Sequence, residues 1–571
     1  MEKIKEFKRL INDLSLDGYL IPKNDEFFSE YTPFNKDNLK FITNFSGSCG
    51  FAIILKKENF LFVDGRYTLQ AKKESGKLFK IFTMPEKCPS DVLKNRKLTI
   101  GFDPKIHTEK MLVYLFKKTN CKLVAVKDNL VKKIRPNFIE KRTRKFFSLN
   151  TNVVGMTYKI KIKKVSSILK KAKINIQFIT APENVAWLLN IRGGDSSYSP
   201  VPNSYVLLDG NKINFFCDSN KLDKKIRIFL KNINIVDINK TVAFLKQIKN
   251  KKIQIDINSC SLEFKNLLKK NNTMLETIDP IYFLKSIKNK VEIKNNIKSH
   301  IYDGAALTRF LIWVKKNYEK KNVTEISAQE KLLEFRKKNR TFKNLSFPTI
   351  SGTGPNGAII HYKADKKNNR KLKKGDLYLI DSGGQYNFGT TDVTRTISLK
   401  NNNKRIRNIF TRVLKGHIAV SNYKIKTNTT GSKIDLIARK ALKEIDLDYP
   451  HGTGHGVGYF LNVHEGPCGI SRGNKTKFLE GMVISNEPGY YENNRFGIRI
   501  ENLIMVKKKN KATFFEELTL VPIDKTLIEK DLLNLNEIRW LNNYHLKVFT
   551  SLKKFMSKDE LPELKNYCSN I

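Results

Sequence analysis

The chain has 571 residues, which is enough for about two to four domains and a sizeable buried core. Hydrophobic residues make up 40% and aromatic residues 10%, a composition that excludes a disordered tail. Lys and Arg number 106 against 55 Asp and Glu, so the formal net charge is +51. The basic residues are spread along the whole chain, which predicts a solvated basic surface and no specific nucleic-acid partner.

Membrane and export signals are not expected from the apolar pattern. No run of about eighteen apolar residues occurs, and the charged N-terminus lacks the apolar core of a secretory signal. The seven cysteines are scattered and form no CxxC pair, which argues against a disulfide framework or a thiolate zinc site. We therefore expect a cytoplasmic protein without a membrane partner.

A first α/β domain is predicted over residues 1–145. Two apolar runs, Phe51 to Leu55 and Phe60 to Val63, are separated by a charged turn and predict a β-hairpin. A helix is expected from Tyr67 to Lys73. The basic, proline-containing stretch from Lys133 to Lys145 is typical of a linker and ends the domain.

A second α/β domain is predicted over residues 146–288. It opens with helical periodicity around Val165, continues with a strand from Ile174 to Ile179, and then has an apolar run from Val185 to Leu189. Its size and rhythm resemble those of the first domain. A duplicated unit is therefore possible, although no sequence repeat proves it.

The third part, residues 289–571, begins with a long amphipathic helix from about Val291 to Lys316. Its apolar positions predict a stripe that faces the core; they are Ile293, Ile297, Ile301, Ala305, Leu307, Leu311 and Val314. The last residues, from about 524 to 571, predict a helical extension that packs on the third part or on a partner subunit.

Two aspartates flank a turn in the third part. Strand-like runs end at Asp381 and begin after Asp392, with an Asn-Phe-Gly turn between them, so a hairpin would bring the two carboxylates together. Carboxylates that close repel each other unless a cation or a proton lies between them. The alternative is a pair of turn-flanking aspartates that cap the backbone or stay solvated.

Three of the eight histidines lie within fourteen positions, at His451, His455 and His464, and glycines frame them. Glycine allows close backbone approach and unusual dihedral angles, so a glycine-framed trio indicates a site more strongly than a lone histidine does. The stretch is not an HExxH zinc helix, because Gly-Pro follows Glu465 and breaks a helix.

Further carboxylates end or line apolar runs. Glu487 follows the run from Val483, and Arg499 and Glu501 share one face of a strand predicted from Phe496 to Leu503. Each could be an ion-pair partner or a turn cap, but an acid on a buried sheet face is costly without a cation. Four carboxylates with a histidine form a hard ligand set that suits a paired site for Mn²⁺, Fe²⁺, Co²⁺ or Zn²⁺.

The order of these residues resembles the metal-ligand order of the pita-bread metallopeptidases, and most closely that of the three-domain Xaa-Pro aminopeptidase (aminopeptidase P) family. The resemblance covers nearly the whole chain. Its clearest motifs are Leu345 to Ile350, Gly354 to Tyr362, Asp381 to Gly383, Thr390 to Thr396, Lys415 to Val420, His451 to Gly469, Glu487 to Glu492 and Phe496 to Asn502. It reaches the N-terminal parts at Val63 to Tyr67 and Asn190 to Asp195, and the tail at Trp540 to His545.

This resemblance implies a mixed α/β (α+β) fold, with two creatinase-like N-terminal domains before a pita-bread catalytic domain. It implies two divalent metal ions, Mn²⁺ by preference, with Asp381 on one metal, Asp392 and Glu501 bridging both, and His455 and Glu487 completing the other. It implies catalytic roles for His361, His451, His464 and Arg499. His361 and His451 would also bind substrate, and Arg192 is a weaker match for a substrate-binding arginine.

The resemblance implies hydrolysis of the bond between an N-terminal residue and a penultimate proline, by a hydroxide that bridges the metals. It also implies a homodimer. Two other classes stay open: a prolidase that cleaves only Xaa-Pro dipeptides, and a non-catalytic pita-bread module that binds partners through its basic surface. Because such modules typically lose metal ligands and this chain keeps all five, the sequence favours an enzyme.

Overall fold

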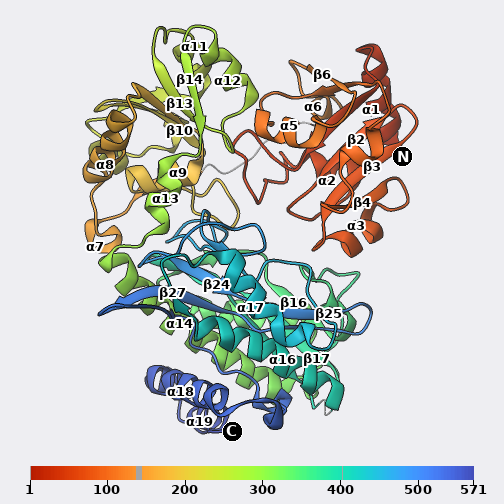
Figure 1. Ribbon diagram of the computed structural model, residues 1–571, viewed down its shortest axis with the longest axis vertical. Helices are drawn as coiled ribbons and strands as arrows, with labels where there is room; N and C mark the ends of the chain where they lie inside the picture. Colours follow the sequence, from red (N-terminus) through yellow and green to blue (C-terminus); the bar gives the residue numbers. More distant parts are fainter. Residues whose placement is uncertain (1, 137–143, 401–402) are drawn as a thin grey trace. The chain divides into compact units, whose positions relative to one another are not determined.

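The computed structural model describes residues 2–136, 144–400 and 403–571 (Figure 1). The chain divides into two compact units. The first contains Met1–Thr151 and Met156–Tyr282, and the second contains Asn152–Gly155 and Phe283–Ile571. The predicted linker from Lys133 to Lys145 lies largely outside the described residues.

The first unit contains two six-stranded sheets, of which one belongs to the N-terminal residues. Its strand order is β4-β3-β2-β1-β5-β6. The strands are β1 (Gly18–Pro22), β2 (Phe51–Leu55), β3 (Asn59–Asp64), β4 (Lys80–Met84), β5 (Thr99–Phe102) and β6 (Lys122–Ala125). Helix α1 (Glu2–Asp13) buries Ile4, Phe7 and Ile11 against this sheet. The predicted hairpin is β2 with β3, and the predicted helix is α3 (Thr68–Ser75).

The second sheet has the order β12-β11-β10-β8-β13-β14. Its strands are β8 (Ile176–Ile179), β10 (Ser204–Asp209), β11 (Lys212–Cys217), β12 (Asn234–Asp237), β13 (Lys252–Asp256) and β14 (Thr273–Thr277). Helices α8 (Tyr158–Lys171), α9 (Pro182–Leu189), α12 (Leu262–Lys269) and α13 (Pro280–Ser286) belong to the same part of the chain. The apolar run from Val185 to Leu189 is therefore helical, and all its side chains are buried.

The two sheets share one topology. In each, the first three strands pair antiparallel, the fourth pairs parallel beside the third, and the fifth and sixth pair parallel on the other side of the first. This is the arrangement expected of a duplicated unit, a possibility that the sequence left open. Neither sheet carries any of the predicted metal ligands.

The second unit packs helices against several small sheets. Helix α14 (Lys290–Asn317) is the long predicted helix, and α15 (Glu325–Lys337), α16 (Lys404–Ser421) and α17 (Gly431–Lys443) follow it. The strands that matter for the site are β17 (Leu377–Ser382), β20 (Val393–Ser398), β24 (Val483–Asn486), β25 (Gly489–Glu492), β26 (Phe496–Arg499) and β27 (Asn502–Lys509). In Figure 1, α14, α16 and α17 lie together along this strand layer.

The predicted C-terminal extension is helical and packs on the second unit. Helices α18 (Leu535–Leu552) and α19 (Leu561–Tyr567) contact α14, and α18 also contacts α16 (Figure 1). Leu541, Val548 and Leu564 are buried in one apolar cluster with Phe410 of α16. Burial of this apolar face explains why the polar-looking tail folds as part of the unit.

Two predictions of local structure need correction. The apolar stripe of α14 is buried at Ala305, Leu307, Leu311 and Val314 but not at Ile297, which is 38% exposed; nearby, Asn295 donates to the backbone oxygens of Asn152 and Val153. The run from Phe496 to Leu503 is not one strand: β26 pairs with β25, β27 pairs with β24, and the chain changes partners at Ile500 and Glu501.

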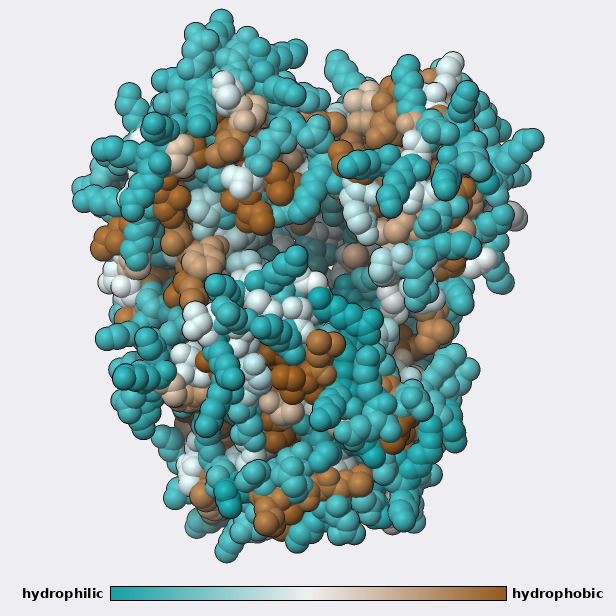
Figure 2. Space-filling model, in the orientation of Figure 1, coloured by the Kyte–Doolittle hydropathy of each residue, from teal (hydrophilic) through white to brown (hydrophobic). Residues whose placement is uncertain are grey.

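The molecular surface is consistent with a high net charge. Figure 2 shows hydrophilic side chains over most of the visible face of each part, with apolar side chains in smaller groups between them. Within the described residues, no helix combines the length and apolar character that a bilayer span requires.

Candidate metal centre

Asp381 and Asp392 meet on neighbouring antiparallel strands, as the sequence predicts. Asp381 lies near the end of β17 and pairs in register with Thr394 of β20, and Asp392 directly precedes β20. Both side chains are buried. The turn between the strands is larger than a simple hairpin, because the short strands β18 (Gly384–Tyr386) and β19 (Gly389–Thr390) form within it.

His455, Glu487 and Glu501 converge on the same point. One ligand atom from each of Asp392, His455 and Glu501 lies within 4.8 Å of the others. His455 Nε2 is 3.5 Å from Asp392 Oδ2 and 3.6 Å from Glu487 Oε1. Arg499 Nη2 donates to Asp381 Oδ2 at 2.6 Å, which ties Asp381 to the strand end that carries Glu501. The structure thus brings together all five predicted ligands.

Backbone contacts hold these side chains in place. Glu487 follows β24, and its N–H donates to Thr453 O at 2.8 Å. Ser485 Oγ accepts from His455 N at 2.9 Å and donates to Glu487 Oε1 at 3.2 Å. Gly454 packs so closely against the Ser485 carbonyl that a Cβ would lie 1.9 Å from its oxygen, so only glycine fits there.

The electrostatics of the cluster call for a cation. Burial raises the pKa of Asp381 to about 7, with a further contribution from Asp392 and an opposing one from Arg499. Burial and the neighbouring carboxylates also raise the pKa of Glu487 and hold that of Glu501 well above its usual range. Burial alone would lower the pKa of His455, but Asp392 and Glu487 raise it to about 9. Buried carboxylates with such raised pKa values are stabilised in their charged form when a metal ion replaces their protons.

The donor set also fits a metal ion. Asp381 Oδ1 is buried and has no hydrogen-bond partner among the described residues. This oxygen is therefore available as a ligand for a cation. Carboxylate oxygens with one imidazole nitrogen suit hard or borderline divalent metals. We conclude that the five residues fit a divalent-metal centre.

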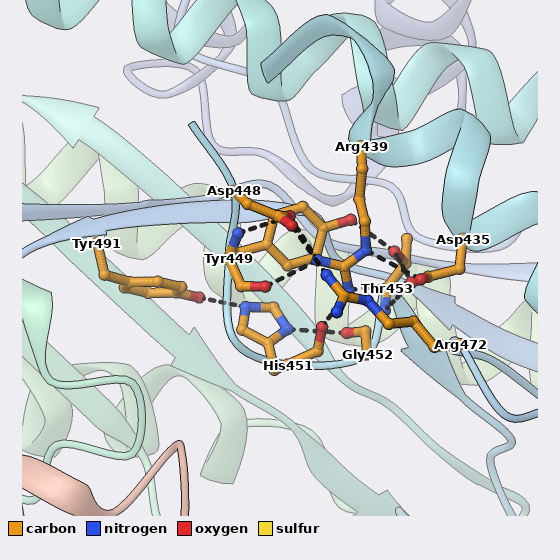
Figure 3. A network of polar contacts seen from close by, with 9 residues as sticks. All are labelled: Asp435, Arg439, Asp448, Tyr449, His451, Gly452, Thr453, Arg472 and Tyr491. Atoms are coloured by element: carbon orange, nitrogen blue, oxygen red, sulfur yellow. Dashed lines mark hydrogen bonds and ion pairs between the residues drawn. The ribbon is translucent and has the colours of Figure 1, made fainter. Parts of the chain in front are cut away.

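A chain of hydrogen bonds links this centre to His451, and Figure 3 shows its last step, from Tyr491 to His451. Arg499 donates from Nη1 to the Tyr491 hydroxyl at 2.6 Å, and that hydroxyl lies 2.9 Å from His451 Nε2. His451 Nδ1 lies 2.8 Å from Gly452 O, which can only accept, so Nδ1 carries a proton. In neutral His451, Nε2 then accepts from Tyr491. Tyr491 is not among the residues that the sequence predicts for the site, although it lies in the matched run from Glu487 to Glu492.

The other predicted residues, His464, His361 and Arg192, lie at different positions relative to the predicted ligands. The His464 ring packs edge-on against the His455 ring, with 4.4 Å between centroids. His361 follows the turn Gly354–Ala358, and the preceding carbonyl, Ile360 O, lies 3.5 Å from Arg499 Nη2. Arg192 belongs to the other compact unit, where its guanidinium donates to Ala186 O and Ile191 O. Its substrate-binding role stays a prediction.

Comparison with family models identifies the catalytic part. The model for metallopeptidase family M24 matches residues 295–508, and that for the C-terminal region of peptidase M24 matches 511–571. Two models for creatinase/prolidase N-terminal domains match residues 3–136 and 135–292. The chain belongs to metallopeptidase family M24. The predicted family resemblance, the mixed α/β fold and the prediction of a metallopeptidase are confirmed.

Two relatives are similar to this chain over nearly their whole length. Xaa-Pro aminopeptidase 1 of Dictyostelium discoideum is 36% identical, over 100% of this chain and 96% of that protein. The probable Xaa-Pro aminopeptidase P of Laccaria bicolor is 37% identical, over 100% of this chain and 93% of that protein.

Among solved structures, an aminopeptidase matches the whole chain, whereas a prolidase matches only part of it. The X-prolyl aminopeptidase of Caenorhabditis elegans, described as a cytosolic enzyme with a di-nuclear active site, has a TM-score of 0.95 and 31% identity, covering 100% of this chain and 99% of that one. The prolidase of Pyrococcus horikoshii has a TM-score of 0.51 and 27% identity, and covers 64% of this chain and 99% of its own.

Proposed function

We propose that this member of family M24 is a metal-dependent aminopeptidase that removes the N-terminal residue from peptides whose second residue is proline. The observation that carries the proposal is the match over the full chain to proteins named Xaa-Pro aminopeptidase, together with the convergence of Asp392, His455 and Glu501, beside which Glu487 lies. Prolidase is the alternative. It is less well supported, because the matched prolidase leaves more than a third of this chain uncovered.

The centre would hold two divalent metals, with Mn²⁺ the preferred ion. Asp381 would bind one metal, Asp392 and Glu501 would bridge both, and His455 and Glu487 would complete the other. The di-nuclear site of the nematode neighbour supports the number of metals. When bound, such metals polarise a carbonyl and lower the pKa of a shared water until it becomes a nucleophile near neutral pH.

The side chains around the centre would handle protons and orient the substrate. Glu487 would accept the proton of the attacking water. His464, beside the ligand His455, would stabilise the developing oxyanion. His451 and His361 would orient the peptide and supply the proton that the prolyl nitrogen needs. Proline offers no N–H, so a close-fitting apolar surface has to select it.

The chemistry of His451 depends on Tyr491. Its Nε2 meets the tyrosine hydroxyl, which Arg499 contacts in turn, and Arg499 contacts Asp381. A proton at His451 is therefore linked electrostatically to the metal-binding carboxylate. This link gives Arg499 two functions: it holds Asp381 in place, and it keeps the Tyr491 hydroxyl directed at the histidine.

Peptide hydrolysis separates the two candidate functions. Purified protein, stripped of metal and then given Mn²⁺, is incubated with Arg-Pro-Pro, Arg-Pro and Arg-Ala-Ala. We expect metal-dependent release of arginine from Arg-Pro-Pro and little from Arg-Ala-Ala. Cleavage of Arg-Pro alone would establish a prolidase, and folded protein that cleaves neither peptide with any divalent metal would favour a binding module.

The remaining predictions concern organisation. We propose three domains, 1–145, 146–288 and 289–571; the two sheets of equal topology and the family-model borders near residues 136 and 292 support this division. A cytoplasmic location is supported by the description of the nematode neighbour as cytosolic. We also propose a homodimer, to be tested by light scattering.

A further inference from the structure

Arg439 is a buried arginine whose five N–H groups all have acceptors (Figure 3). It lies on α17, and its side chain is 3% exposed. Nε and Nη2 donate to the two oxygens of Asp435, one turn earlier, at 2.9 and 3.1 Å. Nη1 donates to Asp448 Oδ1 at 2.6 Å and to Tyr449 O at 2.7 Å, and Nη2 donates to His451 O at 2.5 Å. Five directed bonds fix a guanidinium in one orientation.

The contacts of Arg439 are concentrated on the loop that carries His451. Its guanidinium stacks on the Tyr449 ring at 4.0 Å, and the Tyr449 ring lies 4.9 Å from the His451 ring. The Tyr449 hydroxyl bonds Thr453 Oγ1 at 2.5 Å, and Thr453 Oγ1 donates to Asp435 at 2.7 Å. The loop is therefore held to α17 on both sides of His451.

This anchoring matters because glycine surrounds the histidine. His451 is followed by Gly452 and Gly454, whose backbone is intrinsically permissive, and its ring is half-buried. The loop has no regular secondary structure from residue 449 to 453. The His451 carbonyl, held by Arg439, and the Nδ1 contact to Gly452 O together determine where Nε2 points.

We propose that Arg439 is a positioning residue for His451: through the carbonyls of Tyr449 and His451 it holds the imidazole against Tyr491, in the Nδ1-protonated form. The consequence for catalysis rests on the proposed aminopeptidase function, but the effect on the ring does not. Among the described residues, the hydrogen bonds of Arg439 go to Asp435, Asp448, Tyr449 and His451, none of which is a predicted metal ligand, so Arg439 acts by preorganising His451. A lysine cannot replace it, because a point ammonium cannot reach five divergent acceptors.

A double-mutant cycle tests this coupling. Arg439→Lys is made in the wild type and in His451→Ala, and Arg-Pro-Pro hydrolysis is measured for all four proteins with Mn²⁺. We expect Arg439→Lys to lower kcat by about 10- to 100-fold in the wild type, with KM changed less, but by less than about 3-fold in the His451→Ala background. Equal losses in both backgrounds, or no loss in the wild type, would overturn the proposal.

The matched control is Arg472→Ala. Arg472 shares the acceptor Asp448 with Arg439, but its side chain is 69% exposed and its ion pair is to Asp448, not to a residue of the 449–453 loop. Its removal should leave kcat unchanged. If Arg439→Lys does not fold, Asp448→Ala takes its place, because Asp448 is partly exposed and its loss removes one of the five contacts. A smaller loss, about 2- to 5-fold, should then disappear in the His451→Ala background.

A spectroscopic measurement separates the proposal from the function on which it builds. With ¹⁵N-labelled histidine, the eight histidines give few signals, and His451→Ala assigns the one of interest. We expect a fixed Nδ1-protonated ring in the wild type and in Arg472→Ala, and averaging between tautomers in Arg439→Lys. An unchanged His451 signal in Arg439→Lys would contradict the proposal even if the protein cleaved no peptide. Wild-type protein without activity would contradict the proposed function alone.

Discussion

Tyr491 connects the candidate metal centre with His451, the histidine that we propose handles protons. Its hydroxyl lies between Arg499 Nη1 and His451 Nε2, and burial raises its pKa above the normal range for tyrosine, so it stays protonated at neutral pH. A neutral hydroxyl that accepts from arginine can still donate to the imidazole. The role of His451 therefore depends on a residue whose type alone carries no functional signal.

Tyr491→Phe removes both hydrogen bonds and keeps the ring. We expect kcat to fall about 10- to 100-fold, because the imidazole loses its orienting donor, whereas metal content stays at the wild-type level. Steady-state kinetics on Arg-Pro-Pro with parallel metal analysis provides the measurement. Tyr490→Phe, the neighbouring tyrosine, is the control. A wild-type kcat in Tyr491→Phe would show that the hydroxyl has no such role.

The raised pKa values predict how the metal-free protein responds to pH. Burial raises the pKa of Asp381 from 3.8 to about 7, so its contribution to stability is present at low pH and is lost as the pH rises from about 4 to about 7. The pKa of His455 is raised from 6.5 to about 9, so its contribution is lost as the pH rises through about 9. Both groups therefore lower the free energy of unfolding as the pH rises, so above about pH 5 the metal-free site destabilises the fold more at each higher pH.

Thermal denaturation with EDTA and with Mn²⁺ tests this. We expect the metal-free Tm to be lower at about pH 8.5 than at about pH 6, and Mn²⁺ to raise Tm more at the higher pH, because the ligands bind metal deprotonated. Asp381→Asn, which lacks one titrating group, should reduce the difference. A rise in Tm with Mn²⁺ that does not depend on pH would rule out this linkage.

At the scale of elements, the sequence predicted which strands and loops carry the ligands but not how they are joined. Asp381, Asp392 and Glu487 were predictable because each ends or begins an apolar run, where local patterning is decisive. The change of partners at Glu501 was not, because it depends on Glu501 N bonding Thr394 O on a distant strand. Arg439 and Tyr491 were missed for the same reason: their importance comes from long-range contacts.

A buried ion cluster holds the segment that follows His464. Glu465, directly after His464, lies between Lys285 Nζ at 2.8 Å and Lys288 Nζ at 3.0 Å, and each of these side chains is 1% exposed. Burial opposes ionisation, but the two ammonium groups hold the pKa of Glu465 below its usual range. The carboxylate is therefore needed to balance two charges that have no access to water.

Glu465→Gln would leave both lysines without an anion. We expect it to destabilise the fold by about 3–5 kcal/mol, the usual cost of breaking a buried pair. Glu480→Gln, at an exposed glutamate, is the matched control and should change little. Chemical denaturation of both variants gives the comparison, and equal midpoints for the two would refute the role of the cluster.

The C-terminal helix α18 gives a second test at this scale. Leu541 is fully buried in the cluster that it shares with α16, whereas Leu546 on the same helix is 59% exposed. We expect Leu541→Ala to cost about 2–5 kcal/mol and Leu546→Ala less than about 0.5 kcal/mol. The same denaturation measurement decides this. A similar small effect for both would show that the extension is only loosely attached.

At the scale of the whole molecule, family likeness predicted more than composition did. The charge of +51 predicted only a solvated basic surface and said nothing of the site: the region from His451 to Ile500 is nearly neutral, and Asp381, Asp392 and Glu501 are buried. The repeated topology of the two N-terminal sheets was visible only in the structure, because strand order depends on pairings far apart in sequence. Conversely, the order of the five ligands along the chain was sufficient to predict a metal centre.

The number of metal ions bound per chain tests that centre most directly. Protein dialysed against Mn²⁺ and freed of excess is analysed for metal and protein, together with Asp392→Asn and, as control, Asp448→Asn on the nearby loop. We expect two metals per chain in the wild type and in the control, and a loss of at least one in Asp392→Asn, whose bridging carboxylate is gone. Full occupancy in Asp392→Asn, or no bound metal in the folded wild type, would contradict the assignment.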